Sequence, residues 1–387
     1  MKLLAICNAT DLKYRSVAPT YWQLFKALYE QGNEVITVPY LGYSVQSLWW
    51  RTYPNPCLRE STLYYSLATR QQIKSVGGGG VFSAMFMTLI RTYIRPKWER
   101  HLMRILDKEG DIDAILFLST PLNHLAGIPG KIKARFSIPI IYYDGDLPTS
   151  LPSYSHRKTF KFSFYGGANL NEYDAFLSSS KGAIPMLEEI GAKNVYPFYY
   201  GVDPDLFSPV QVEQDIDIFY YGSNHRTKER RINYMVTEPS RALHNCRFLI
   251  GGRKPSIDLG NVETCGVLPI SAWRVYSCRS KINLNITKEI DAETYATSSA
   301  RPFELASMGC CVVSDSYNGL EEWFKAGEEM FVVNNAKEAL DTYNMLLDSE
   351  ELRLKTGELA RERVLREHTT QHRAKQLMDI LENVKKE

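Results

Sequence analysis

Short apolar runs alternate with longer segments of helical periodicity along both halves of the chain, and this alternation limits the fold more than any other feature. A strand followed by a helix and another strand is typical of a parallel sheet covered by helices on both faces. In the first half we expect strands at Leu3–Cys7, Glu34–Pro39, Ala114–Leu118, Ile138–Tyr143 and Ala175–Ser178. The helices expected between them are Tyr21–Gln31, Lys97–Glu109 and Ile184–Ile190. The sequence therefore predicts a doubly wound α/β domain.

The same pattern starts again after residues 201–209, a turn-rich segment with two prolines. The strands expected there are Asp217–Tyr221, Phe248–Gly251, Val262–Thr264, Ile282–Asn285, Cys311–Ser314 and Met330–Val333. A helix is expected at Arg226–Thr237, and the chain is predicted to be helical from Ala336 onward. Because 387 residues are too many for one ordinary core, we predict two α/β domains, 1–205 and 206–387. The first carries a less regular insertion at about 43–100, and the last helix is predicted to pack back on the first domain.

The composition excludes several classes of protein. Hydrophobic residues make up 44% of the chain and charged residues 23%, which is typical of a folded water-soluble protein. The seven cysteines are scattered, odd in number and without metal-ligand spacing, which favours reduced thiols and a cytoplasmic location. The most apolar stretch, 81–94, is interrupted by Arg91 and is shorter than a membrane span of about 18 residues. Peripheral membrane association stays open.

The segment 299–315 holds the most informative candidate site. A short helix of small and apolar residues is expected to carry Glu304 at its start and to end at Gly309, before a buried strand. A carboxylate at a helix N-terminus is favoured by the helix dipole and can accept from ligand hydroxyls. The free N–H groups of the same turn, with Arg301 beside them, suit a phosphate. One turn that offers both matches the ribose and the diphosphate of a nucleotide-sugar.

Other polar segments of the second half lie where strands are predicted to end. Gly222 and Ser223 follow one strand and open a helix whose first turns hold four cations. These cations are Arg226, Lys228, Arg230 and Arg231. Cations at a helix N-terminus oppose the dipole, so a bound anion would relieve them. Asn285 at a strand end and Ser299 before Arg301 are further candidates, with ordinary turn and cap roles as the alternative.

In the first half, one predicted strand ends abruptly in Asp144 and Asp146. Ligands of open α/β sheets bind outside the carboxyl ends of strands, so either carboxylate could act as a base toward an acceptor hydroxyl. Both could instead form a turn around Gly145. A metal site is a third alternative, although no third acid or histidine has useful spacing. His124, after another strand, is a candidate polar group or a purely structural residue.

With these residues, the chain resembles a nucleotide-sugar glycosyltransferase of the GT-B type, in which two Rossmann-like domains face each other across a cleft. The likeness is to group-1 transferases related to family 4, and more closely to CgeB-like (spore maturation type) proteins. It extends over about 201–365, and its most specific match is Arg301-Pro-Phe-Glu-Leu-Ala-Ser-Met-Gly309. Supporting matches are 201–207, 221–223 and 280–285.

The resemblance implies roles for the candidate residues. Glu304 would bind the donor ribose, and Arg301 with the backbone from Ala300 through Pro302 and Phe303 would hold the diphosphate. Residues 223–231 would complete the phosphate site, and the base would lie near 266–269 and Tyr276. Asp144 falls where related enzymes keep a residue close to the sugar. No cofactor and no metal would be needed, the donor would be a UDP-sugar and the enzyme a hexosyltransferase.

One departure and several alternatives qualify this resemblance. Family-4 enzymes carry an acid eight positions before the helix glutamate, where this chain has Ala296, so retention or inversion stays open. The same fold could serve an epimerase, a phosphorylase or a non-catalytic sugar-nucleotide-binding module. The acceptor is expected to be a glycan or a lipid-linked hydroxyl. The aromatic and basic segment 43–104 could contact a membrane, bind a nucleic acid or pack on its own domain.

Overall fold

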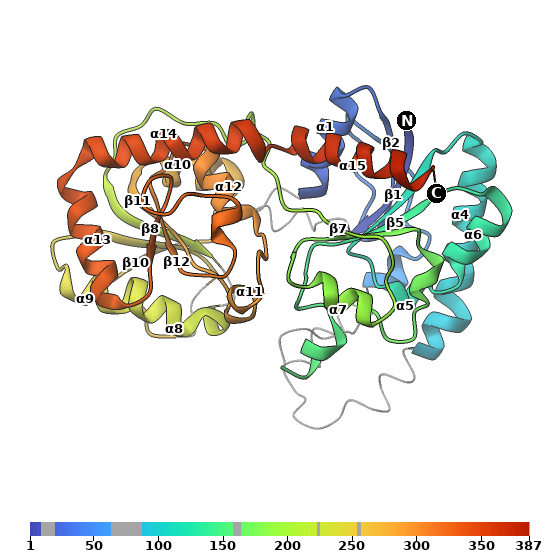
Figure 1. Cartoon of the computed structure of the whole chain (residues 1–387), viewed down its shortest axis with the longest axis horizontal. Coiled ribbons are helices and arrows are strands. Elements are labelled where there is room, and N and C mark those ends of the chain that lie inside the picture. The colour runs from blue at the N-terminus through green and yellow to red at the C-terminus, as the bar shows by residue number, and fades with distance from the viewer. Residues whose placement is uncertain (9–19, 63–86, 158–163, 223–224, 254–256, 387) are drawn as a thin grey trace. The chain divides into compact units, whose positions relative to one another are not determined.

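The computed structural model contains two parallel β-sheets with helices on both faces (Figure 1). It describes the chain except for residues 9–19, 63–86, 158–163, 223–224, 254–256 and 387. The first sheet has seven strands in the order β3-β2-β1-β4-β5-β6-β7. The second has six strands in the order β10-β9-β8-β11-β12-β13. All strand pairs are parallel, which confirms the predicted doubly wound α/β class.

The strands of the first sheet are nearly continuous buried apolar runs, as expected where helices cover both faces. They are β1 (Lys2–Asn8), β2 (Glu34–Leu41), β3 (Arg51–Thr52), β4 (Ala114–Leu118), β5 (Ile140–Asp144), β6 (Ala175–Ser178) and β7 (Val195–Pro197). One face packs on α4 (Arg95–Glu109), α5 (Leu122–Leu125), α6 (Ile128–Phe136) and α7 (Ile184–Glu189). On the other, Leu24 of α1 (Thr20–Glu30) and Leu377 of α15 (Thr370–Val384) lie against the central strands.

The second sheet is built in the same way, with a separate core on each face. Its strands are β8 (Ile216–Gly222), β9 (Phe248–Gly252), β10 (Glu263–Gly266), β11 (Ser280–Asn285), β12 (Val312–Asp315) and β13 (Phe331–Val333). Above the sheet in Figure 1 lie α10 (Ile270–Cys278), α12 (Ala300–Ser307) and α14 (Glu350–Glu367). Below it lie α8 (Glu229–Ile232), α9 (Glu238–Ala242) and α13 (Ala336–Asp348). The remaining α-helix is α11 (Glu289–Glu293).

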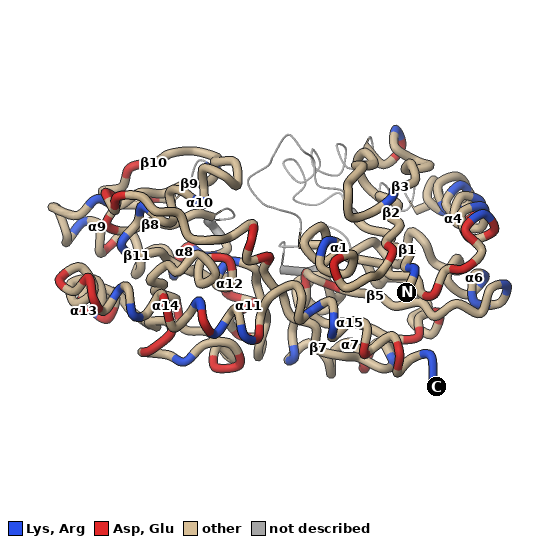
Figure 2. The backbone as a smooth tube through the Cα atoms, turned by 90° about the horizontal axis from the view of Figure 1, so that it is seen from above, with Lys and Arg blue, Asp and Glu red and all other residues tan. Residues whose placement is uncertain are grey.

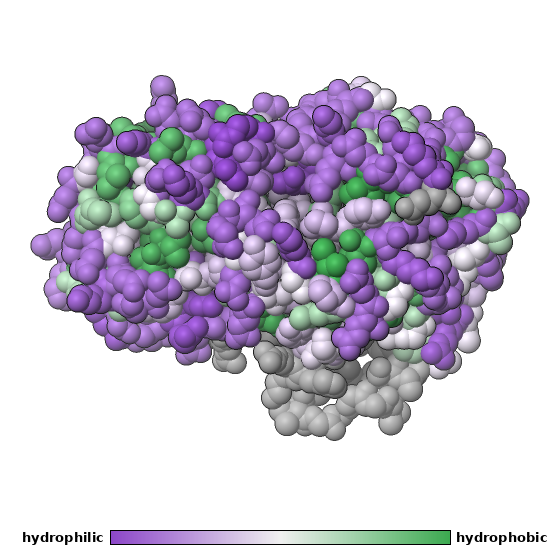
Figure 3. All heavy atoms as spheres, viewed as in Figure 1, coloured by the Kyte–Doolittle hydropathy of each residue, from purple (hydrophilic) through white to green (hydrophobic). Residues whose placement is uncertain are grey.

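Contacts divide the chain into two compact units. Among the described residues, unit 1 comprises 1–8, 24–62, 87–157, 164–198 and 374–386, and unit 2 comprises 20–23, 199–222, 225–253 and 257–373. The division therefore falls after Phe198 rather than near 205, and the last part of α15 belongs to unit 1. No helix of the described residues is long and apolar enough to cross a membrane. On the face shown in Figure 3, hydrophilic residues prevail and hydrophobic ones form small separate patches.

The strands agree closely with the apolar runs of the sequence, whereas several helices do not. The expected helix Arg226–Thr237 is helical throughout but not uniformly α: a 3₁₀ turn (His225–Lys228) leads into α8, a π-helical turn (Asn233–Thr237) and α9. Helices α5, α6, α10 and α11 were not expected from the sequence. The sequence of α10, ISAWRVYSC, mixes β-branched and aromatic residues, which have no strong helical preference. Packing of these side chains in the core therefore decides the structure of this segment.

Candidate functional site

The candidate site lies at the carboxyl edge of the second sheet, where β8 and β9 end in glycines. Gly252 has a φ of +123°, and a Cβ atom added to it would lie 1.9 Å from the carbonyl oxygen of Gly222. Only glycine allows two backbones to approach so closely. The strand ends therefore present bare backbone at this edge, which is the usual place for ligands of open α/β sheets.

The N-terminal turn of α12 comes to the same edge, because α12 lies in the connection between the parallel strands β11 and β12 and runs opposite to them. Ser299 is the N-cap, is exposed and makes no side-chain cap hydrogen bond. Pro302 has no N–H, so it cannot contribute the backbone donor expected of it. The ring of Phe303 is buried against Trp323, Phe324 and His368. Phe303 therefore belongs to the core, and only its backbone could face a ligand.

The guanidinium of Arg301 lies over two aromatic rings. Its central carbon is 4.3 Å from the ring centroid of Trp273 and 5.4 Å from that of Tyr221. Its side chain is 23% exposed, and its one ion pair in the described chain, to Glu304, is long at 3.7 Å. No hydrogen bond joins the guanidinium to another described residue. Cation–π contact therefore orients Arg301 while its N–H donors stay available for a ligand.

Glu304 lies in the second turn of α12, which corrects the expectation that it begins the helix. The helix starts at Ala300, ahead of Pro302, because proline is tolerated in a first turn. Side chains of a helix tilt toward its N-terminus, so the Glu304 carboxylate still reaches back to Arg301. Its side chain is 5% exposed. Burial raises the pKa of Glu304, and Arg301 opposes that rise.

Lys228 is the second cation at this edge. Its ammonium donates to the carbonyl oxygen of Ile286 (2.5 Å) and to the hydroxyl of Tyr220 (3.4 Å). Burial, together with the charges of Lys288 and Arg301, lowers the pKa of Lys228 to about 8, and the charges of Asp315 and Asp291 oppose this shift. A cation held by neutral oxygen atoms and weakened by neighbouring cations is one that an anionic ligand would stabilise.

A buried ion pair between Asp315 and Arg231 lies at the same edge of the sheet. The side chain of Asp315, at the end of β12, lies 3.1 Å from Arg231 of α8 and accepts from the backbone N–H of Thr287 (2.8 Å). Burial raises the pKa of Asp315 to about 6, which Arg231 opposes. Its place among the four cations of this helix suggested that Arg231 binds phosphate. In the structure it is instead the ion-pair partner of Asp315. Arg230 is exposed and hydrogen-bonded to Glu289.

The other predicted donor residues divide into three groups. Asn285 is buried and donates to the hydroxyl of Ser314 (2.9 Å), so it joins the ends of β11 and β12. Tyr276 of α10 is half-buried, with its ring 6.1 Å from that of Phe219. Ser223 lies outside the described residues, and of Arg226 only the backbone is described. Ala296, where the related family has an acid, is buried in a left-handed turn with φ +46°.

In unit 1, Asp144 is buried and its carboxylate is occupied by its own loop. One oxygen accepts from the N–H of Asp146 (2.9 Å), and the other from the hydroxyls of Ser150 (2.6 Å) and Tyr165 (2.5 Å). Burial and the nearby charge of Asp146 raise the pKa of Asp144 to about 6, against these hydrogen bonds. This is the geometry of a carboxylate that fixes a loop.

The other two candidates of unit 1 differ in exposure. Asp146 is exposed just beyond the end of β5. His124 is 2% exposed in α5, and its Nδ1 is hydrogen-bonded to the hydroxyl of Tyr40. Burial lowers the pKa of His124 to about 3, and Arg95 adds to this effect, so the ring is neutral. Of the three side chains, Asp146 alone is open to solvent.

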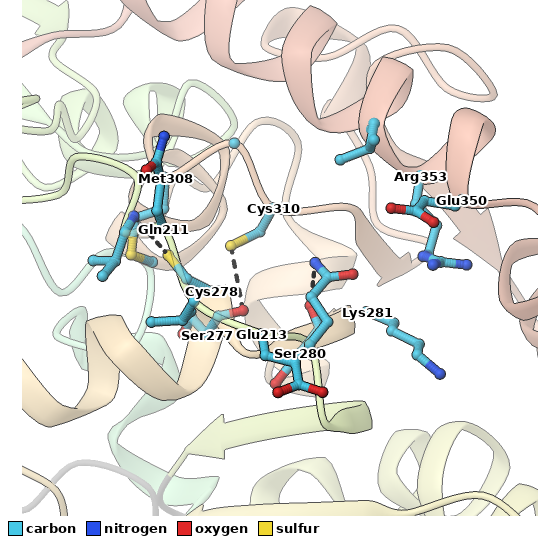
Figure 4. Close-up of a pocket in the computed structure, with 15 residues that line it drawn as sticks. Gln211, Glu213, Ser277, Cys278, Ser280, Lys281, Met308, Cys310, Glu350 and Arg353 are labelled. Atoms are coloured by element: carbon cyan, nitrogen blue, oxygen red, sulfur yellow. Dashed lines mark hydrogen bonds between the residues drawn. The ribbon is translucent and has the colours of Figure 1, made fainter.

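A separate pocket of about 540 Å³ lies at the other end of α12 (Figure 4). Its lining includes Cys278, Met308, Cys310 and the start of β11 at Ser280. The thiol of Cys310 donates to the carbonyl oxygen of Ser277 (3.6 Å), and Cys278 accepts from the N–H of Val210 (3.4 Å). This pocket shares no residue with the candidate site described above, around the ends of β8 and β9 and the start of α12, which we call the carboxyl-edge site. Within the described ranges, no group of three or more His, Cys, Asp or Glu could hold a metal ion.

Comparison with known proteins agrees with this architecture. Residues 230–379 match a family model described as glycosyl transferase-like. Sucrose-phosphate synthase from Thermosynechococcus elongatus has a TM-score of 0.63 at 14% identity, over 99% of both chains. Anabaena HepE in complex with UDP-glucose has a TM-score of 0.61 at 11% identity, over 99% of this chain and 100% of that chain. T4 phage BGT with its UDP-glucose substrate gives 0.56 at 12%, over 99% of both. No curated protein sequence matches the chain significantly.

These likenesses establish the fold. The chain has the GT-B fold that its sequence predicted, and the carboxyl-edge site lies mostly within the segment that matches the glycosyl transferase-like model. Two parts of the site, Trp273 and the ring of Tyr221, were missed by the sequence reasoning. Tyr221 was noted only as part of the Tyr-Gly-Ser match, and Trp273 lies in a helix that was not expected.

Proposed function

We propose that the protein is a glycosyltransferase that moves a hexose from a nucleotide-diphosphate sugar, and that unit 2 binds the donor. The observation that carries this proposal is the pairing of Arg301 with the buried carboxylate of Glu304 at the N-terminal turn of α12. A guanidinium beside backbone N–H groups suits a diphosphate. A carboxylate held one turn further on suits the hydroxyls of a ribose. The family match over 230–379 supports the same assignment.

The donor we propose is a UDP-sugar. Solved structures of similar fold are described in complex with UDP or UDP-glucose, which supports this choice of nucleotide. Charge that develops on the departing diphosphate would be stabilised by Arg301, Lys228 and the N–H groups of Ala300 and Arg301. Two cations and a helix N-terminus are a sufficient electrostatic source for this step, so we propose catalysis without a metal. We further propose that the protein belongs to the CgeB-like subtype of these transferases.

For unit 1 we propose Asp146 as the acid–base residue. A general base must come within hydrogen-bond distance of the acceptor hydroxyl, which requires an accessible side chain. Asp146 is exposed, whereas Asp144 and His124 are buried and hydrogen-bonded to their own unit. Asp144 would then support the loop that carries Asp146, through the bond from the Asp146 N–H. Loss of transfer in Asp146→Asn with retained donor hydrolysis would support this role.

For the acceptor we propose a carbohydrate or a lipid-linked glycan, reached in part through a peripheral membrane contact of residues 43–104. Part of the predicted aromatic surface is core, since Trp50 and Trp98 are buried. Other members are exposed: Tyr43 (74%), Leu48 (90%), Trp49 (37%), Leu89 (42%) and Tyr93 (45%). The basic residues of α4 follow in the same segment and are blue along its backbone in Figure 2. Apolar and cationic groups together suit an anionic lipid surface.

The donor proposal is tested by thermal shift with UDP-glucose and with GDP-, ADP- and dTDP-sugars. Binding to the native state raises the melting temperature by mass action, so the true donor should give the largest rise. Glu304→Ala should abolish this rise and the slow hydrolysis of the donor, and Glu304→Gln should weaken both. Glu358→Ala removes an exposed carboxylate of α14 and serves as the control. Unchanged donor affinity in Glu304→Ala would refute the ribose role.

Membrane contact is tested separately, by co-sedimentation with liposomes. Vesicles that contain phosphatidylglycerol should retain the protein, and Leu48→Ser with Trp49→Ser should reduce retention. Vesicles of phosphatidylcholine alone and short duplex DNA are the comparison ligands. Binding to DNA rather than to anionic vesicles would replace the lipid proposal by the nucleic-acid alternative.

A further inference from the structure

Arg301 is oriented almost entirely by aromatic rings. The rings of Tyr221 and Trp273 lie 6.0 Å apart at an interplanar angle of 44°, and the guanidinium lies over both. Arginine usually keeps its direction through hydrogen bonds to acidic or carbonyl groups. Among the described residues Arg301 has only the long 3.7 Å pair with Glu304. The direction of the guanidinium therefore depends on the two rings.

Each ring is itself fixed by the fold. Trp273 is 2% exposed and packs edge-on against Phe207 at 5.5 Å. Tyr221 belongs to β8, and its hydroxyl makes two hydrogen bonds to one residue. It accepts from the N–H of Leu268 (3.2 Å) and donates to the carbonyl oxygen of Leu268 (3.1 Å). Tyr221 therefore joins the Arg301 site to the loop 266–269, between β10 and α10.

We infer that Trp273 and Tyr221 are positioning residues of the donor site, with separate effects on the two ends of a nucleoside diphosphate. Trp273 sets the direction of Arg301 toward the diphosphate. The ring of Tyr221 contacts Arg301, and its hydroxyl holds the loop 266–269, near which the family resemblance would place the base. This inference rests on the proposed donor function. It adds Trp273 and Tyr221 to the proposed donor site as residues that act through Arg301 and the loop, not by contact with the reacting atoms.

The two roles give different binding signatures, measured by titration calorimetry with uridine and with UDP. The ratio of the uridine Kd to the UDP Kd reports the contribution of the diphosphate. Trp273→Leu should lower this ratio roughly two- to thirty-fold, the range of a cation–π contact, and leave the uridine Kd within about twofold. Tyr221→Phe keeps the ring, so it should weaken uridine and UDP equally and leave the ratio unchanged.

Three controls separate positioning from general loss of structure. Trp323→Leu removes another fully buried tryptophan of unit 2, one that contacts Phe303 instead of Arg301, and should leave the ratio unchanged. Trp273→Phe retains a π face and should restore most of the ratio, even if the leucine variant folds poorly. In an Arg301→Ala background, Trp273→Leu should cause no further change in the ratio.

The outcomes distinguish the inference from the proposed function. If the wild type binds none of UDP, GDP, ADP and dTDP, the donor function fails and the inference fails with it. If the wild type binds UDP but the ratio is the same in Trp273→Leu as in the wild type, the donor function stands and the positioning role is refuted. An equal loss of ratio in Trp323→Leu would also refute it, because the effect would then be general destabilisation.

Discussion

Burial of Asp144 should make the stability of the protein depend on pH in a specific way. The group has a pKa of about 6 in the folded state, against an ordinary value of 3.8. Because the folded pKa is the higher one, the folded protein binds the proton more tightly, and stability contributed by this group falls as pH rises. A shift of about 2 units corresponds to roughly 3 kcal/mol of unfolding free energy. The full penalty is present above pH ~6 and absent below pH ~4.

Asp144→Asn removes the charge and keeps the shape. The asparagine oxygen can still accept from the N–H of Asp146, while its amide can donate to the hydroxyls of Ser150 and Tyr165, which can rotate to accept. The rearranged hydrogen bonds change stability by an amount that does not depend on pH. The difference in unfolding free energy, variant minus wild type, should therefore become more positive by roughly 3 kcal/mol between pH 4 and pH 7.5.

The assay is urea unfolding of the wild type and the variant, followed by a probe of unit 1 at several pH values. Because the two proteins are compared at each pH, the titration of all other groups largely cancels. Asp146→Asn is the control for loss of a charge in the same loop; it should show only a small change of the same sign, since the Asp146 charge adds to the raised pKa of Asp144. Parallel stability curves for wild type and Asp144→Asn would refute the reasoning, because Asp144 would then titrate normally in the folded protein.

Two further predictions concern the carboxyl-edge site. Lys228 has a pKa lowered to about 8, so its ammonium is lost as pH rises through that value, and UDP affinity should fall several-fold between pH 7 and pH 9. In calorimetry, the pH dependence of UDP affinity should disappear in Lys228→Met. It should persist in the control Lys281→Met, because Lys281 lies at the start of β11, away from the carboxyl edge. If it persists in Lys228→Met as well, another group is titrating. Gly252→Ala places a Cβ 1.9 Å from the Gly222 carbonyl at a φ of +123°, so it should destabilise unit 2 by at least about 2 kcal/mol in urea unfolding. Gly266→Ala, also at positive φ but with open space around it, should cost less.

The sequence predicts the sheets well because buried parallel strands are short, continuous apolar runs bounded by turns. The run Ala114–Leu118 and the run Ala175–Ser178 coincide with β4 and β6. The helices are harder, because short helices with mixed composition form only through packing. Segment Ile270–Cys278 is the clearest case: Trp273 is held by contacts to Phe207 and Tyr221, far away in the chain. No local pattern reveals such contacts.

Because such distant contacts have no local pattern, the sequence alone could not show which candidate residues are bonded within their own unit and which are left for a ligand. Asp144 and His124 look like Glu304 and Arg301 in the sequence, as polar residues that follow or precede strands. In the structure, the Asp144 carboxylate receives three hydrogen bonds and the His124 ring is bonded to Tyr40. The side chains of Glu304 and Arg301 make no hydrogen bond to other described residues; their one ionic contact there is the long 3.7 Å ion pair between them. Whether a polar group at a strand end is satisfied by its own fold depends on distant residues, and it decides which group is left for a ligand.

The charges at the carboxyl edge of the second sheet support the anionic donor that we propose for it. Lys228 is weakened as a cation by burial and by the charges of Lys288 and Arg301. Asp315, the acid that opposes this most, is itself paired with Arg231 and accepts from the N–H of Thr287, and Asp291 is paired with Lys288. Lys228 thus has no ion-pair partner among the described residues, and Arg301 has only the long 3.7 Å pair with Glu304, in a place that is partly shielded from water. Folding retains such an arrangement only at a cost in free energy, and an anion that contacts Arg301 and Lys228 together removes that cost. A diphosphate carries the negative charge that such an anion needs, whereas a neutral sugar does not.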